Sequence, residues 1–219
     1  MRMRKKKNGE ARLASHAHLL CAKPSTPFDG AAAVFAREEN APLCLEIGCG
    51  KGAFACGMAA LHPEYCFLAI ERVSDVMIAA LERADPLSSE RSDNLRFMIA
   101  DANDLEACFA AESIDTIYLN FSDPWPKKGY YKRRLTYRVF LDMYFKILVP
   151  GGALRFKTDN RPLFEFTLEE LAATGRTPEF VTYDLHNSPY AEGNVMTEYE
   201  TNFVSQGMPI HALCVRKPR

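Results

Sequence analysis

The chain has 219 residues, of which 47% are hydrophobic and 25% are charged, and its formal net charge at pH 7 is −1. This length and balance are typical of one folded domain with a sizeable core. No apolar run approaches the ~18 residues that a membrane span needs, and no apolar stretch of the signal-peptide type follows residues 1–7. We therefore exclude membrane and secreted classes and expect a cytoplasmic protein.

The spacing of the cysteines and histidines indicates neither a disulfide framework nor a metal site. The seven cysteines are scattered and form no CxxC pair, and the five histidines lack the spacing of zinc ligands. Scattered cysteines favour free thiols in a reducing compartment over a disulfide framework. We therefore predict that the protein has no metal site.

Apolar runs alternate with helical patterns along the chain. Strands are expected at residues 43–47, 65–70, 95–99, 114–120, 152–157, 180–185 and 210–215. Helices are expected at residues 52–61, 72–84, 133–148 and 161–173, with a short Ala-rich helix near 28–38. This alternation predicts an α/β fold with a doubly wound, mostly parallel, seven-stranded sheet. The last two strands have no clear helix between them, which favours an antiparallel C-terminal hairpin.

Two regions follow from this reading of the chain. Residues 1–40 form a basic N-terminal extension that carries the short helix, and residues 41–219 form a single domain. No internal repeat or linker interrupts residues 40–219.

A glycine-rich loop follows the first expected strand. Gly48, Gly50 and Gly52 allow a tight turn that brings backbone amides close to a ligand. The loop alone is a weak signal, but Glu71 ends the second strand 19 residues after Gly52. An acid at that place accepts hydrogen bonds from the ribose hydroxyls of an adenosine.

Two further acids end neighbouring strands. Glu46 directly precedes the glycines, where a carboxylate suits the positive charge of S-adenosylmethionine better than a phosphate, and Asp101 follows the third strand. Each acid could instead be a helix cap. All three together favour S-adenosylmethionine as the cofactor.

The segment after the fourth strand is a stiff loop with reactive side chains. Residues 123–126 read Asp-Pro-Trp-Pro and lie where the strand order of such a sheet reverses, which is where ligands bind. Asp123 would lie near a transferred methyl group and Trp125 could stack on a base. The alternative is a proline-rich turn with a buried tryptophan. Both an exocyclic amine and guanine N7 remain open as acceptors.

Acids that could recognise guanine occur later in the chain. Asp159 and the run Thr197-Glu198-Tyr199-Glu200 could accept hydrogen bonds from the guanine N1–H and amino group. Asp159 could instead cap the helix at Pro162, and the two glutamates could simply be solvated.

Two clusters of positive charge occur on this nearly neutral chain. Residues 2–7 and 127–138 hold only basic charges, and the second range also carries tyrosines beside Trp125. Rings and cations together suit base stacking and phosphate binding, so we expect a nucleic-acid surface. The alternative is a solubilising tail and a solvated helix face.

On these stretches the chain resembles the bacterial tRNA (guanine-N7)-methyltransferases. The matching stretches are residues 46–52, 69–71, 101–102, 118–127, 156–160 and 197–200, and the resemblance spans about residues 1–217. It implies a Rossmann-like class I methyltransferase fold. It also implies methyl transfer from S-adenosylmethionine to N7 of guanine 46 in the tRNA variable loop, giving S-adenosylhomocysteine.

The resemblance also implies roles for individual residues. Cofactor contacts are expected from Glu46, Gly48, Gly50, Glu71, Asp101 and Asp123. Asp123 is also the expected catalytic residue. The tRNA contacts are expected from Lys127, Asp159, Thr197, Glu198, Tyr199 and Glu200.

The resemblance leaves several points open. Residues 8–10 read Asn-Gly-Glu where relatives usually carry Pro-Trp-Ala, so the N-terminal arm departs from the family pattern. No obligate protein partner is evident, and the protein would be a monomer or a homodimer. The alternatives are an exocyclic-amine methyltransferase of RNA or DNA and a non-catalytic RNA-binding relative.

Overall fold

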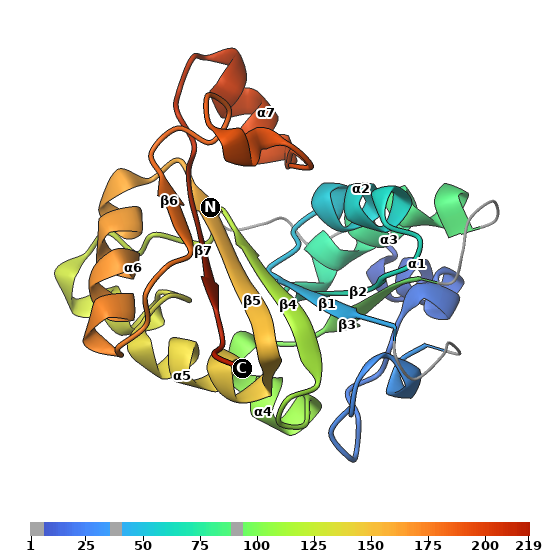
Figure 1. Ribbon diagram of the computed structural model, residues 1–219. Coiled ribbons are helices and arrows are strands. Elements are labelled where there is room, and N and C mark those ends of the chain that lie inside the picture. Colours follow the sequence, from blue (N-terminus) through green and yellow to red (C-terminus); the bar gives the residue numbers. More distant parts are fainter. Residues whose placement is uncertain (1–6, 36–40, 89–93) are drawn as a thin grey trace.

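The computed structural model describes residues 7–35, 41–88 and 94–219, and one mixed sheet forms its centre (Figure 1). The strands of the sheet lie in the order β3-β2-β1-β4-β5-β7-β6. Their bounds are β1 Leu43–Ile47, β2 Cys66–Glu71, β3 Leu95–Ile99, β4 Ile114–Asn120, β5 Leu148–Thr158, β6 Phe180–Thr182 and β7 His211–Arg216.

The pairing of the strands confirms the predicted fold class. Strands β1 to β5 are parallel, with β1 between β2 and β4, and the order of the strands reverses there. Strand β7 lies antiparallel between β5 and β6. The protein is therefore doubly wound, mostly parallel and closed by antiparallel C-terminal strands.

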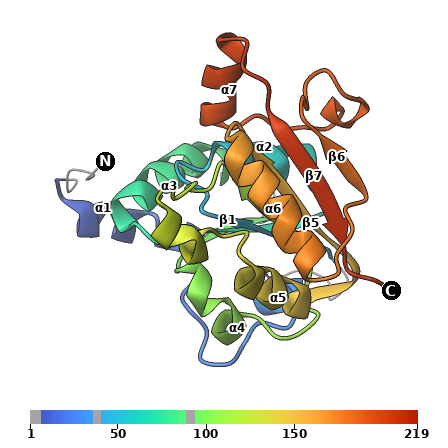
Figure 2. The same ribbon diagram turned by 90° about the vertical axis from the view of Figure 1, so that its left-hand side faces the viewer.

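Helices cover both faces of the sheet, as Figures 1 and 2 show. One face carries α1 Gly9–Ser15, α2 Ala53–Leu61 and α3 Ser74–Ser88, and the other carries α4 Leu105–Cys108, α5 Arg138–Ile147 and α6 Arg161–Ala173. Each face forms its own apolar cluster against the sheet. Because it is covered on both faces, β1 is a continuous run of buried residues, including Glu46.

Helix α7 (Glu198–Ser205) stands apart from these layers, at the upper edge of the sheet in Figure 1. The sequence analysis expected no helix between the last two strands, so that expectation was wrong. A reciprocal capping box explains the helix: Thr197 Oγ1 accepts from Glu200 N, and the Glu200 carboxylate accepts from Thr197 N. The sequence pattern Thr-x-x-Glu is the signal that could have predicted it.

The helix expected at residues 133–148 begins later, at Arg138. Before it, residues Lys128–Arg133 form a 3₁₀ helix, and Arg134 then adopts an extended backbone. This turn lets the Arg134 side chain donate to the carbonyl oxygens of Pro124 and Trp125. A tertiary contact therefore overrides the local helical pattern.

Strand β5 begins at Leu148, four residues earlier than expected. Residues 150–152, which include two glycines, lie inside this strand as an irregularity, with Gly151 at a φ of 82°. The pairing of β4 with β5 shifts register between Ile114 and Thr116 to accommodate the extra residues.

The described part of the N-terminal extension packs on the domain. Helix α1 contacts α3, where Arg12 pairs with Glu82, and Leu19 and Phe35 are buried. The short helix expected near 28–38 is replaced, within the described residues, by a 3₁₀ turn at Ala31–Ala33. Residues 36–38 of that expectation lie outside the described residues.

Among the described residues, no helix has both the length and the apolar character needed to cross a membrane.

Candidate active site

A cleft of about 900 Å³ opens at the carboxyl ends of the parallel strands, where the strand order reverses between β1 and β4. It brings together residues that are far apart in the sequence. The expected site residues that line it are Glu46, Gly48, Gly50, Glu71, Asp101, Asp123, Thr197, Glu198 and Tyr199. Lys127, Asp159 and Glu200 are not among its lining residues.

Glu46 is the buried acid of the cleft, with only 5% of its surface exposed. Its Oε1 accepts a hydrogen bond of 2.9 Å from Asn120 Nδ2, at the end of β4. Its Oε2 is buried and has no hydrogen-bond partner among the described residues. Burial raises the pKa of Glu46 to about 7, because desolvation disfavours the charged form. An unpartnered buried carboxylate oxygen in a cleft indicates a ligand that donates to it.

The glycine loop and Glu71 hold each other in place. Gly48, Gly50 and Gly52 have φ values of 78°, 56° and 75°, which side chains other than glycine rarely adopt. The Glu71 carboxylate accepts from Gly50 N at 3.3 Å and from Val73 N at 2.9 Å. A carboxylate offers about four acceptor positions, so Glu71 can still bind hydroxyl groups in the cleft.

Asp101 has two roles in the structure. It caps the 3₁₀ helix Ala102–Asp104, where its side chain accepts from Asn103 N at 3.0 Å. The alternative of a helix cap therefore holds for this acid, although Asp101 also lines the cleft.

The loop after β4 has a constrained backbone and free polar groups. Phe121 and Trp125 have φ values of 52° and 42°, which are rare for bulky residues and are typical of functional loops. Ser122 Oγ is buried without a partner among the described residues. Asp123 is exposed and, within the described chain, forms no hydrogen bond or ion pair. Its carboxylate is therefore available to a ligand.

Rings and cations surround the mouth of the cleft beside this loop. The Arg133 guanidinium lies 4.3 Å from the centre of the Trp125 ring and 5.4 Å from that of Tyr130. Trp125 is half-buried, so the alternative of a buried tryptophan does not hold. Arg133 and Lys132 also line the cleft. This arrangement suits a base that stacks and a phosphate that pairs with cations.

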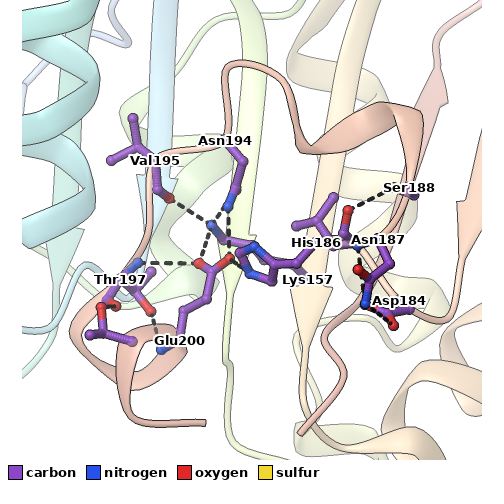
Figure 3. A network of polar contacts seen from close by, with 11 residues as sticks. Lys157, Asp184, His186, Asn187, Ser188, Asn194, Val195, Thr197 and Glu200 are labelled. Carbon is purple, nitrogen blue, oxygen red and sulfur yellow. Dashed lines mark hydrogen bonds and ion pairs between the residues drawn. The ribbon is translucent and has the colours of Figure 1, made fainter. Parts of the chain in front are cut away.

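The start of α7 closes the other side of the cleft. Glu198 pairs with Lys51 at 3.0 Å and also with Arg83, so it is not simply solvated. Tyr199 keeps 66% of its surface exposed. Glu200, in contrast, is fully buried and pairs with Lys157 at 2.6 Å (Figure 3). The structure thus places Glu200 behind the cleft, although the sequence analysis expected it at the substrate.

Asp159 and Lys127 lie outside the cleft lining. The expected alternative for Asp159 was a helix cap, but Asn160 caps α6 by accepting from Leu163 N at 2.9 Å. Asp159 is therefore not explained as a cap, and it lies just after β5. Lys127 is exposed next to the 3₁₀ helix that carries Arg133.

Three residues that shape this site were not among the predicted site residues. Asn120 orients Glu46, Ser122 has a hydroxyl without a partner among the described residues, and Lys157 anchors Glu200. Arg133, which stacks on the rings, lies in the basic range 127–138 that the sequence predicted to bind nucleic acid. The burial of Lys157 could not be predicted from the sequence, because a lysine near the end of a strand is usually exposed to solvent.

The residues present fit S-adenosylmethionine. The unpartnered oxygen of Glu46 suits an ammonium group, and the carboxylates of Glu71 and Asp101 suit ribose and adenine donors. In the parts of the chain that the structure describes, no group of three or more His, Cys, Asp or Glu residues is placed to hold a metal ion.

Comparisons with known proteins find methyltransferases. A family model described as "Putative methyltransferase" matches residues 40–213. A tRNA (guanine-N(7)-)-methyltransferase of Lachnoclostridium phytofermentans is 47% identical over 174 residues, which cover 80% of each chain.

Solved structures show a shared fold at low identity. The 16S rRNA methyltransferase KamB has a TM-score of 0.58 and 16% identity, covering 81% of this chain and 88% of its own. Phosphoethanolamine N-methyltransferase 2 of Haemonchus contortus, solved in complex with S-adenosyl-L-methionine, has a TM-score of 0.52 and 14% identity, covering 84% of this chain and 50% of its own.

Proposed function

The chain belongs to the family of tRNA (guanine-N7)-methyltransferases, and we propose that it methylates N7 of a guanine in tRNA with S-adenosylmethionine as the donor. Its fold is that of the class I methyltransferases. The observation that carries the proposal is the cleft itself, which is lined by a buried carboxylate with one oxygen unpartnered among the described residues, by the unpaired Asp123 and by a surface of rings and cations.

We assign the cofactor to the side of the cleft formed by β1, β2 and β3. Glu46 would bind the ammonium group, Glu71 the ribose hydroxyls and Asp101 the adenine amino group, with the amides of Gly48 and Gly50 at close approach. When bound, S-adenosylmethionine supplies an electrophilic methyl group. We propose that the Ser122 hydroxyl, which has no partner among the described residues and belongs to a residue that lines the cleft, donates to the same ligand.

The target atom explains how little acid–base chemistry the site contains. Guanine N7 carries a lone pair and no hydrogen, so its methylation requires no base. It requires that the base be positioned and that the positive charge formed on the ring be stabilised. The unpaired, exposed carboxylate of Asp123 can provide that stabilisation, and Trp125 can hold the base by stacking.

Substrate contacts are assigned to the α7 side and the basic loop. We propose that Thr197, Glu198, Tyr199 and Asp159 face the base and that Lys127, Lys132 and Arg133 bind tRNA phosphates. We extend the proposal to guanine 46 of the variable loop, as the family resemblance implies. The seven cysteines are free, which supports a reducing, cytoplasmic setting.

Labelled S-adenosylmethionine and unmodified tRNA test this function directly. We expect transfer of the label, followed by chain cleavage at a variable-loop guanine after borohydride reduction and aniline treatment. Label without cleavage would indicate an amine or carbon acceptor and would overturn the N7 assignment. Binding of tRNA without any binding of cofactor would indicate a non-catalytic relative.

The Asp123→Ala variant separates chemistry from folding in the same assay. Because Asp123 is exposed and forms no contact with other described residues, we expect the melting temperature and the far-UV circular dichroism to stay unchanged. Methyl transfer should fall about 100-fold or more. An unfolded or insoluble variant would show that Asp123 is structural and would contradict its catalytic role.

A further inference from the structure

A buried charge pair joins α7 to the centre of the sheet (Figure 3). Lys157 near the end of β5 is 4% exposed and Glu200 in α7 is fully buried. Lys157 Nζ donates to Glu200 Oε2 at 2.6 Å, to Asn194 Oδ1 at 2.8 Å and to Val195 O at 2.8 Å. These three contacts use all three hydrogens of the ammonium group.

Glu200 is equally saturated. Its Oε2 also accepts from Thr197 N at 3.2 Å, while its Oε1 accepts from Asn194 Nδ2 at 2.8 Å and lies 2.9 Å from His186 Nε2. Four partners fill the acceptor positions of one carboxylate. Glu200 therefore has no acceptor position left for a substrate, and its contacts all point into the protein.

The pair holds the same segment that forms one wall of the cleft. Thr197, Glu198, Tyr199 and Asn202 line the cleft, and they lie between or beside the residues that Lys157 and Glu200 bind. The backbone of Lys157 also binds the loop after β4, because its carbonyl oxygen accepts from Phe121 N at 2.9 Å. Lys157 thus lies where the two walls of the cleft meet.

A second contact fixes the segment from another direction. Val195 packs so closely on Gly57 of α2 that a Cβ atom at residue 57 would lie 2.5 Å from Val195 Cγ1. The ammonium group of Lys157 also lies 5.0 Å from the centre of the Phe54 ring in α2. The segment is therefore held between α2 and β5.

We propose that Lys157 is a positioning residue, and that its buried pair with Glu200 fixes residues 194–205 over the cleft so that residues 197–199 meet the target base. This inference rests on the proposed function, since it assigns these residues to the tRNA side. It replaces the expected substrate contact of Glu200 with an internal role. The energetic reason is that a buried, fully satisfied ion pair specifies one arrangement, whereas removing one partner leaves the other charge uncompensated.

The Lys157→Met variant tests the proposal, because it keeps the length of the side chain and removes its charge. We expect kcat/KM for tRNA to fall roughly 100-fold, as for a displaced substrate-positioning group. Binding of S-adenosylhomocysteine should weaken much less, only through the loss of the Lys157 charge that lowers the pKa of Glu46. Hydrogen exchange should become faster in residues 194–205 and stay unchanged in β1 and β4.

Lys217→Met is the matched control. Lys217 also donates to a carboxylate and to a backbone carbonyl, those of Glu112 and Leu148, but at the opposite end of β5. We expect wild-type kcat/KM and wild-type exchange in residues 194–205. An equal loss of activity in both variants would overturn the positioning role.

If Lys157→Met fails to fold, the Gly57→Ala variant tests whether the anchoring of residues 194–205 is needed for activity. The added methyl group must displace Val195 without removing any charge, and alanine favours the helix. We expect the same fall in kcat/KM for tRNA and the same faster exchange. Normal exchange in residues 194–205 of either variant would overturn the inference. If the wild-type protein makes no N7-methylguanine, the proposed function fails, but the exchange comparison still tests the anchoring.

Discussion

At the scale of single residues, the carboxyl group of Glu46 combines burial with an unused acceptor. Its pKa is raised to about 7 by desolvation, and the hydrogen bond from Asn120 offsets only part of this cost. The ionised form is therefore disfavoured until a positively charged ligand arrives. The same side chain thus opposes stability in the free protein and favours binding of the cofactor.

The pH dependence of cofactor binding checks this conclusion. Because Glu46 ionises near pH 7, we expect the dissociation constant for S-adenosylhomocysteine to decrease from pH 6 to pH 8. The Glu46→Gln variant should lose this dependence and bind about tenfold more weakly or worse, as for a lost charged hydrogen bond. Calorimetric titration at pH 6 and pH 8 measures the dissociation constant of each variant. Glu169→Gln, on the exposed face of α6, is the control and should bind S-adenosylhomocysteine as the wild-type protein does.

The contribution of Glu46 to the stability of the free protein should fall as the pH rises, whereas its contribution to cofactor binding should increase. A carboxyl group with a raised pKa stabilises the folded state while protonated, and this contribution is lost as the pH rises from about 4.5 to about 7. Glu46→Gln should therefore raise the melting temperature of the free protein more at pH 8 than at pH 5. A variant that loses stability at pH 8 would contradict the assigned pKa.

At the scale of elements, the 3₁₀ helix Lys128–Arg133 and the residue after it have separate tasks. Lys132 and Arg133 present their charges at the cleft, and Arg133 stacks on Trp125. Arg134 turns inward, where it binds the carbonyls of Pro124 and Trp125 and lies 4.4 Å from the ring centre of Phe166. Arg133 therefore faces the cleft, whereas the adjacent Arg134 supports the backbone of the loop.

Salt titrations of tRNA binding separate these two roles. Replacing Lys132 and Arg133 with alanine should weaken binding and reduce the slope of log K against log salt by about one for each phosphate that the variant no longer binds. Arg134→Ala should lower kcat, because the loop that carries Asp123 loses its support, with the slope retained. Lys146→Ala on α5, which removes a surface pair with Glu106 of α4, serves as the control. An unchanged slope in the double variant would place this helix away from the RNA.

The elements that sequence predicted well are those whose burial sets their pattern. Strands β1 and β2 are runs of buried, mostly apolar residues because both faces of the sheet are covered, and the acids near the strand ends are visible in the sequence. The cleft acids at Glu46, Glu71 and Asp101 followed from this spacing alone. Elements fixed by distant contacts were misjudged: Arg134 delays α5 through its bonds to the preceding loop, and Glu200 turns inward because it pairs there with Lys157. No local pattern reveals such a partner.

At the scale of the whole molecule, one sheet joins two apolar layers and places every assigned group along a single edge. Strands β1 and β4 are neighbours where the strand order reverses, and the cleft that would hold both ligands opens at their carboxyl ends. The N-terminal extension packs on α3, whose Asp75 and Val76 line the same cleft. The whole chain, rather than one loop, thus shapes the substrate surface.

The position of β7 has a consequence for how the protein is made. This strand lies inside the sheet, between β5 and β6, although it follows both of them in the chain. During synthesis on the ribosome, β6 therefore has no neighbour to pair with until residue 216 has emerged. We expect a truncated chain that ends at residue 205, once released from the ribosome, to be cut by protease around residues 180–200, and the full-length chain to resist. Resistance of the truncated chain would show that this part folds without β7. The enzyme would thus acquire its base-recognition wall last, only after the cofactor wall is complete.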